Sequence, residues 1–271
     1  MSSVKTAIEW TDKTWNPTTG CDKVSSGCKF CYAETITERF AASFPTGFKF
    51  TQHPGRLNEP RRWRSPSFVF VNSMSDLFHE EMPLDYLRQI FTVMRECPQH
   101  VFQVLTKRHK RLVELAPQLD WAPNIWMGVS VENQANAQRV DYLRQVKASV
   151  RFLSCEPLLG PLRLDLKDIH WVITGGESGP QHRPIKTDWV RSIRDQCQEQ
   201  DVAFFHKQWG GLRPKSGGRL LDGRTWDEMP HTSKPQGILA LASDSLEDVV
   251  CDVQSSRVLA RKDQAVHGSV F

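Results

Sequence analysis

The sequence has no run of apolar residues long enough to cross a membrane. Residues 1–14 are polar and lack the apolar core that a signal peptide requires. We therefore expect no membrane association and a cytoplasmic location. The 271 residues are 39% apolar and 24% charged, which is the balance of a soluble globular protein with room for a large core.

A strong surplus of one charge is also missing. The chain carries 35 basic and 31 acidic residues, a net charge of +4. This mild excess permits an anionic partner but does not require one.

Paired cysteines are not evident either, because the chain has seven cysteines and no secretory signal. An odd number in this context argues against a disulfide framework. Four of them are scattered and are expected to be small buried hydrophobic residues: Cys97, Cys155, Cys197 and Cys251. The other three, Cys21, Cys28 and Cys31, fall within eleven residues and need a chemical explanation.

Six short apolar runs, rich in Val, Ile, Phe and Trp, recur along the chain. Continuous runs of this kind are typical of strands buried on both faces of a parallel sheet. Strand and helical patterns alternate, so an α/β architecture is predicted, either an open sheet or a barrel. The predicted strands are 68–71, 101–105, 125–131, 150–153, 171–174 and 202–205.

Three stretches between these strands have helical periodicity: 84–94, 140–146 and 189–197, the last with Thr187 as its expected N-cap. The connection 158–168 is short, contains Pro and Gly, and is expected to lack a full helix. Residues 213–230 are predicted to form a long loop. We expect one main domain, 1–230, and a C-terminal extension, 231–271, that is partly disordered.

Every predicted strand is followed by polar or reactive side chains. In parallel α/β folds the carboxyl ends of the strands gather at one edge, where active sites lie. This placement gives five candidates for substrate contact or proton transfer: Lys107, Glu156, Glu177, His206 and Lys207. Each of them could instead be a structural hydrogen-bond partner.

The cysteines stand in the stretch WNPTTGCDKVSSGCKFCY, residues 15–32, with the spacing C-x6-C-x2-C. Gly20 and Gly27 each precede a cysteine, which suits a closely wrapped loop. Spacing alone leaves three interpretations open. The cysteines cluster by chance, they bind zinc with a distant fourth ligand such as His53 or His79, or they hold three irons of a 4Fe–4S cluster whose fourth iron stays open.

The segment Cys28-Lys29-Phe30-Cys31 resembles the second half of the radical S-adenosylmethionine (SAM) signature, in which an aromatic residue precedes the last cysteine. Over residues 5–230 the chain resembles a phage-associated three-cysteine-motif family that groups with the radical SAM superfamily. Further matching stretches are SMSDLF (73–78), LTKR (105–108), GVSVE (128–132), CEPL (155–158), GGESG (175–179), KQWG (207–210) and DGR (222–224).

The resemblance implies a partial (β/α) TIM-like barrel of parallel strands with an N-terminal iron–sulfur loop. It implies a 4Fe–4S cluster on Cys21, Cys28 and Cys31, S-adenosylmethionine as cofactor, and an external electron donor. Here six residues, rather than the usual three, separate the first two cysteines. The sequence Gly-Gly-Glu, residues 175–177, resembles the motif that binds the methionine part of SAM but follows a later strand than usual.

Residues 72–76 occupy the usual place of that motif. Ser73, Ser75 and Asp76 are therefore assigned to the amino group of SAM or nearby polar contacts, and Ser130 and Glu132 to the ribose hydroxyls. For the substrate, two basic clusters favour a nucleic-acid base or nucleotide. One is Arg61, Arg62 and Arg64 around Trp63, and the other is Lys107, Arg108, Lys110 and Arg111.

Three hypotheses follow. The first is a radical SAM enzyme that forms a 5′-deoxyadenosyl radical, in modification or repair of a nucleic-acid base or nucleotide. The second is a zinc-stabilised protein that binds nucleic acid or another partner without radical catalysis. The third is a barrel hydrolase in which the cysteines are incidental.

Overall fold

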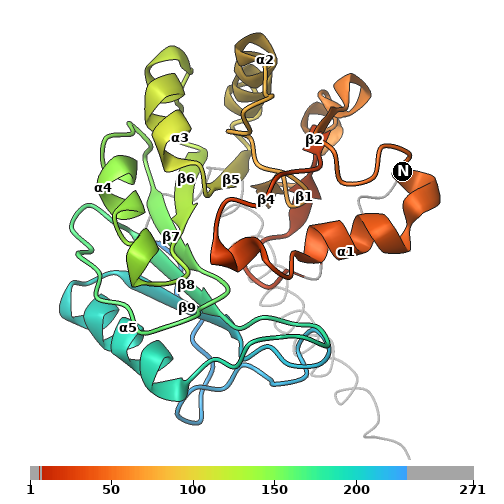
Figure 1. Cartoon of the computed structure of the whole chain (residues 1–271). Coiled ribbons are helices and arrows are strands. Elements are labelled where there is room, and N and C mark those ends of the chain that lie inside the picture. Colours follow the sequence, from red (N-terminus) through yellow and green to blue (C-terminus); the bar gives the residue numbers. More distant parts are fainter. Residues whose placement is uncertain (1–5, 7, 231–271) are drawn as a thin grey trace, which may run out of the picture. The chain divides into compact units, whose positions relative to one another are not determined.

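The computed structural model describes residue 6 and residues 8–230. Its main feature is a sheet of seven strands in which every neighbouring pair is parallel (Figure 1). The strands follow one another in chain order and the sheet curls into a half-barrel, so the predicted partial (β/α) barrel is confirmed. The strands are β1 (Lys13–Trp15), β4 (Ser67–Val71), β5 (His100–Thr106), β6 (Ile125–Ser130), β7 (Arg151–Cys155), β8 (Trp171–Gly175) and β9 (Ala203–Gln208).

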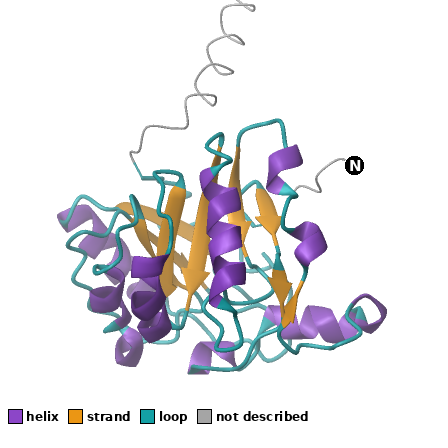
Figure 2. Cartoon of the chain, turned by 90° about the horizontal axis from the view of Figure 1, so that it is seen from above, coloured by secondary structure: helices purple, strands orange, loops and turns teal. Residues whose placement is uncertain are grey.

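Four helices line the outer side of the arc, and Figure 2 shows them against the strands in a second view. They are α2 (Leu84–Arg95), α3 (His109–Leu115), α4 (Arg139–Leu143) and α5 (Thr187–Glu199). A further helix, α1 (Tyr32–Arg39), follows the cysteine segment, and the short strands β2 (Thr18–Thr19) and β3 (Thr51–Gln52) pair antiparallel. None of the described helices is both long and apolar enough to span a bilayer.

The two faces of the sheet bury different side chains, because successive residues of a strand point to opposite sides. One face packs under the helices with aliphatic residues such as Val71, Val104 and Val129. The inner face carries an aromatic cluster centred on Trp171. The ring centroid of Trp171 lies 5.7 Å from that of Phe152 and 6.2 Å from that of Trp126. This cluster fills the half-barrel near the amino-terminal ends of the strands. The side chains near the carboxyl ends are polar.

All six predicted strands are confirmed within a few residues, as are the helical patterns at 84–94 and 189–197. The described segments 158–168 and 213–230 contain no helix and no strand of these sheets, as predicted. The helix α4 ends at Leu143 and does not reach Val146. The prediction for Thr187 was wrong by one position, because Lys186 has the extended backbone of the cap and Thr187 is already helical. The predicted C-terminal extension, 231–271, lies outside the described residues.

A testable consequence concerns Gly128, which lies directly opposite Phe152 in the sheet. A methyl group on Gly128 would lie 2.5 Å from the Phe152 ring, so Gly128→Ala must displace the aromatic cluster. We expect a loss of about 1–3 kcal/mol in the free energy of unfolding, measured by urea denaturation. Gly160→Ala, which meets nothing within 4 Å, serves as the control and should stay within about 0.5 kcal/mol of the wild type. Equal stability of the two variants would contradict the packing described.

Candidate metal and cofactor site

The cysteine loop leaves β1 and is tied first to the segment that follows β4. The amide of Gly20 donates to the Met74 carbonyl at 2.9 Å, and the Ser75 hydroxyl donates to the Gly20 carbonyl at 2.6 Å. Gly20 has a φ of +83°, a backbone conformation that favours glycine. These bonds place Cys21 at the carboxyl end of β4.

The second half of the loop is tied to the end of β6. The Ser25 hydroxyl donates to Oε1 of Glu132 at 2.6 Å, and the Asn133 amide donates to the Ser26 hydroxyl at 3.2 Å. A methyl group on Gly27 would lie 2.5 Å from Oε1 of Glu132, so only glycine fits there without a shift. The six residues between Cys21 and Cys28 thus carry the chain from β4 to β6, a distance of two strand spacings, or about 10 Å.

The three thiols are free and partly exposed, and Cys31 immediately precedes α1. Among the described residues, the one group of three potential ligand atoms within 4.8 Å of one another is Asp22, His79 and Glu81, so the three sulfurs are not gathered that closely. A donor set of three cysteine sulfurs fits a polynuclear iron–sulfur cluster whose fourth iron stays open.

Neither histidine considered as a fourth zinc ligand joins the cysteines. Nε2 of His53 lies 2.8 Å from the Thr19 hydroxyl. Nδ1 of His79 accepts the Glu81 amide at 3.1 Å, so Nε2 carries the proton and faces Oδ2 of Asp22 at 3.1 Å. Both ring nitrogens of His79 are therefore engaged within the chain.

Cys21 lies in a mixed electrostatic environment. Burial, together with the Asp76 carboxylate, raises the pKa of its thiol to about 12, while Arg108 acts in the opposite direction. Nη2 of Arg108 lies 3.9 Å from the Cys21 sulfur. The thiol is thus neutral on its own and becomes a thiolate when a bound metal supplies positive charge.

Glu132 is the most buried charged group at this edge, with none of its side chain exposed. Oε2 accepts from Arg139 at 2.8 Å and from Asn136 at 2.9 Å, and Oε1 accepts from Ser25. Nζ of Lys107 lies 3.9 Å from Oε1. The carboxylate therefore joins β6, α4 and the cysteine loop.

Asp76 has a similar supporting role between β4 and β5. Its carboxylate accepts the hydroxyl of Thr106 at 2.7 Å and the amides of Lys107 and Phe78 at 3.0 and 2.9 Å. The hydroxyl of Ser73 donates to Asn16 at 3.2 Å, and the Ser73 carbonyl accepts the Tyr32 hydroxyl. All of these bonds lie within the chain and fix the ends of neighbouring strands.

The inner face of the half-barrel changes from aromatic to polar toward its carboxyl end. The alternation that places Trp126 and Phe152 inside also places Ser130, Ser154 and Lys207 on that face. Nζ of Lys107 donates to the Ser130 hydroxyl at 3.1 Å. Nζ of Lys207 lies 3.0 Å from Oε1 of Glu156, with side chains 23% and 15% exposed. These groups form a polar wall in which Ser130 and Ser154 are buried and Lys107, Lys207 and Glu156 remain partly exposed.

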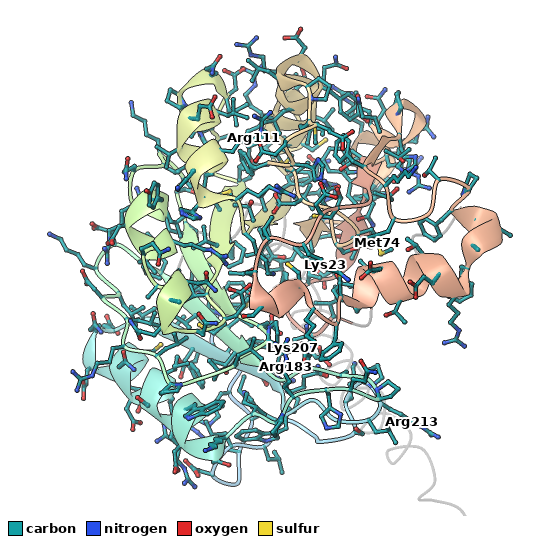
Figure 3. The ribbon with its side chains drawn as sticks, viewed as in Figure 1. Lys23, Met74, Arg111, Arg183, Lys207 and Arg213 are labelled. Atoms are coloured by element: carbon teal, nitrogen blue, oxygen red, sulfur yellow. The ribbon has the colours of Figure 1, made fainter. Side chains whose placement is uncertain are left out.

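Two features complete this wall. Gly175 leaves room for Glu156, because a methyl group there would lie 2.6 Å from Oε1 of Glu156. Glu177 accepts the amide of Arg183 at 3.0 Å and pairs with its guanidinium, which lies 5.4 Å from the Phe30 ring centroid in the cysteine loop. In the view of Figure 3, Lys207 and Arg183 lie between β9 and α1.

The structure does not bring His206 to the other candidates. It neighbours Lys207 in β9 and therefore points to the opposite face, where it is fully buried against Thr174 and Trp209. Burial, with a smaller effect of Arg219, lowers the pKa of His206 to about 4. Its position is that of a core residue on the helix-covered side of the sheet.

The two basic clusters are also separated. Trp63 packs 5.8 Å from the ring of His100, which begins β5, so Arg61, Arg62 and Arg64 belong to the edge opposite the cysteines. Only the cluster that begins at Lys107 follows the carboxyl end of a strand.

Sequence reasoning missed three supporting residues: Ser25, Arg139 and Arg183. Arg139 is buried against Glu132 and belongs to α4, where Val140 and Leu143 are also buried, and no sequence pattern marked it as a site residue. Arg183 meets Glu177 across an irregular segment, and no periodicity connects the two. The three scattered cysteines that are described, Cys97, Cys155 and Cys197, are buried as predicted, and Cys251 lies outside the described residues.

Fold and site together define a half-barrel protein with a three-cysteine loop at the carboxyl ends of its strands. The chain belongs to the family described as "Protein of unknown function (DUF5131)", whose model matches residues 5–230. No curated protein matches the sequence.

Two solved structures are similar to the chain at 11% sequence identity, and 73% of this chain is covered in both. One is a spore photoproduct lyase complexed with dinucleoside spore photoproduct, with a TM-score of 0.44. The other is a spore photoproduct lyase mutant with bound AdoMet and dinucleoside spore photoproduct, with a TM-score of 0.43. The chain spans 64% of the length of each.

The buried position of His206 predicts a pH dependence of stability. Between pH 6.5 and about 4 the unfolded chain binds a proton that folded His206 excludes, so the stability present above pH 6.5 falls as the pH is lowered. The loss attributable to His206 is about 3 kcal/mol. Urea unfolding of the wild type and His206→Asn at pH 7 and pH 4.5 should show a weaker pH dependence in the variant. An identical dependence would place His206 in contact with solvent.

Proposed function

We propose that this protein is a radical SAM enzyme that holds a 4Fe–4S cluster on Cys21, Cys28 and Cys31. One observation carries the proposal: three free thiols stand at the carboxyl rim of a parallel half-barrel, and both histidines considered as a fourth zinc ligand are engaged elsewhere. When bound, the cluster and S-adenosylmethionine supply one-electron cleavage of the sulfonium, which yields a 5′-deoxyadenosyl radical. The protein contributes binding, orientation and exclusion of water.

For S-adenosylmethionine, the polar inner wall supplies the contacts. Ser130 and Ser73 keep their assignment to the ribose and amino ends of the cofactor, and Lys107 adds a donor beside Ser130. Ser75 binds the Gly20 carbonyl of the cysteine loop, Asp76 binds Thr106 at the end of β5, and Glu132 binds Arg139 of α4. We propose that these three act on the cofactor through the cysteine loop and the strand ends.

The substrate proposed is a nucleic-acid base or nucleotide, in modification or repair. Three cationic side chains belong to this wall, Lys107 after β5, Arg183 in the segment after β8 and Lys207 in β9, and they suit a phosphate-bearing ligand. Glu156 and Lys207 form an ion pair that remains partly exposed, and Glu177 orients Arg183. Glu156 and Lys207 are therefore the proposed groups for substrate contact or proton transfer.

The proposal also includes a location and a partner. The six described cysteines are free, which suits a reducing compartment, so we propose a cytoplasmic protein. The cluster must be reduced by one electron before it can cleave the sulfonium, and an external donor is expected to supply that electron. The phage association implied by the motif resemblance stays a prediction.

Anaerobic purification followed by iron and sulfide analysis tests the proposed function. We expect about four irons per chain, and 5′-deoxyadenosine after reduction with dithionite in the presence of S-adenosylmethionine. Replacing Cys21, Cys28 or Cys31 by Ala should abolish both, since each removes a cluster ligand. Val24→Ala, an exposed position of the same loop, should retain both.

Stoichiometric zinc without iron would refute this function in favour of a zinc-stabilised binding protein. A hydrolytic activity that is the same in the wild type and in all three Cys→Ala variants would instead favour a hydrolase with incidental cysteines.

A second prediction concerns the contact between the cysteine loop and the Glu132 carboxylate. Gly27→Ala places a methyl group 2.5 Å from the carboxylate and should push Cys28 outward, which lowers the iron content severalfold after reconstitution. Gly55→Ala, with open space around the added methyl, should retain wild-type iron. Equal iron in both variants, measured colorimetrically on folded protein, would show that Glu132 does not seat the loop.

A further inference from the structure

One buried cation is not accounted for by substrate binding. Arg108 follows β5 and was expected to meet an anionic substrate, but its side chain is only 7% exposed. Its guanidinium turns toward the cysteine loop, where Nη2 lies 3.9 Å from the sulfur of Cys21. A cation shielded from water in this way needs a negative partner.

The position of Arg108 is fixed by the strand ends. Its amide donates to the Thr106 hydroxyl at 2.9 Å, and that hydroxyl donates in turn to Asp76. Nη1 of Arg108 lies 3.6 Å from Glu80, an exposed carboxylate that Arg111 also approaches at 3.7 Å. Nε of Arg108 has no hydrogen-bond partner among the described residues. Of the two side chains that the guanidinium approaches, Glu80 and Cys21, only Cys21 is a proposed cluster ligand.

We propose that Arg108 is a positioning residue that sets the reduction potential of the cluster by donating an N–H bond to the Cys21 sulfur. This inference rests on the proposed function. Hydrogen bonds to the sulfurs and nearby charge are among the factors that set iron–sulfur potentials. Reduction adds negative charge to the cluster, and a directed donor with a positive charge stabilises that state, so Arg108 raises the potential.

Lysine is not an equivalent residue at this position. The planar guanidinium approaches Cys21 with Nη2 and Glu80 with Nη1 at the same time. An ammonium group is a compact point charge that cannot span both partners. Arg108→Lys therefore keeps the charge and loses the directed bond, whereas Arg108→Met loses both.

Redox titration followed by electron paramagnetic resonance tests the proposal on anaerobically reconstituted full-length protein. We expect the midpoint potential to shift to a more negative value in Arg108→Met, and by a smaller amount in Arg108→Lys. Arg111→Met is the matched control, because Arg111 also approaches Glu80 but has no contact with Cys21, and its potential should equal that of the wild type.

An Arg108→Met protein with wild-type iron and an unchanged potential overturns the inference and leaves the proposed function intact. If Arg108→Met does not retain a cluster, Arg108→Lys decides, and an unchanged potential in that variant overturns the inference. A wild-type protein that binds no iron refutes the proposed function itself. The two failures are therefore distinguishable.

Discussion

The site depends on one buried ionic interaction, the pairing of Glu132 with Arg139. A carboxylate removed from water is costly unless it is paired and hydrogen-bonded, and Glu132 meets this condition with partners from three parts of the chain. Arg139 and Asn136 bind one oxygen, and Ser25 of the cysteine loop binds the other. Because these partners share one carboxylate, the end of β6, the start of α4 and the cysteine loop are held together.

This constraint also explains how the longer cysteine spacing is accommodated. Gly20 is held at the end of β4, and Ser25 is held at the end of β6, so the six-residue spacer crosses the rim of the half-barrel. Along the inner face, Trp171 and its aromatic neighbours give way to the polar wall that contains Ser130 and Lys207. The aromatic part stabilises the half-barrel, and the polar part carries the proposed cofactor and substrate contacts.

Much of the fold could be predicted from the sequence, because strands buried on both faces leave continuous apolar runs. The three-residue β1 and the short α1 left no pattern strong enough to detect. The site was harder, since position at a strand end does not specify a face. His206 and Lys207 are adjacent in sequence, yet alternation sends one into the core and the other into the half-barrel. Partners such as Arg183, joined through an irregular segment, become visible only in three dimensions.

The central claim is that three thiolates leave one corner of a metal cluster open to S-adenosylmethionine. Electron paramagnetic resonance of the reduced protein, recorded with and without S-adenosylmethionine, tests it most directly. We expect the signal of a reduced 4Fe–4S cluster that changes when S-adenosylmethionine is added, because the ligand binds the open iron. A cluster signal that is indifferent to S-adenosylmethionine, or a silent protein with one tightly bound zinc ion, would contradict it.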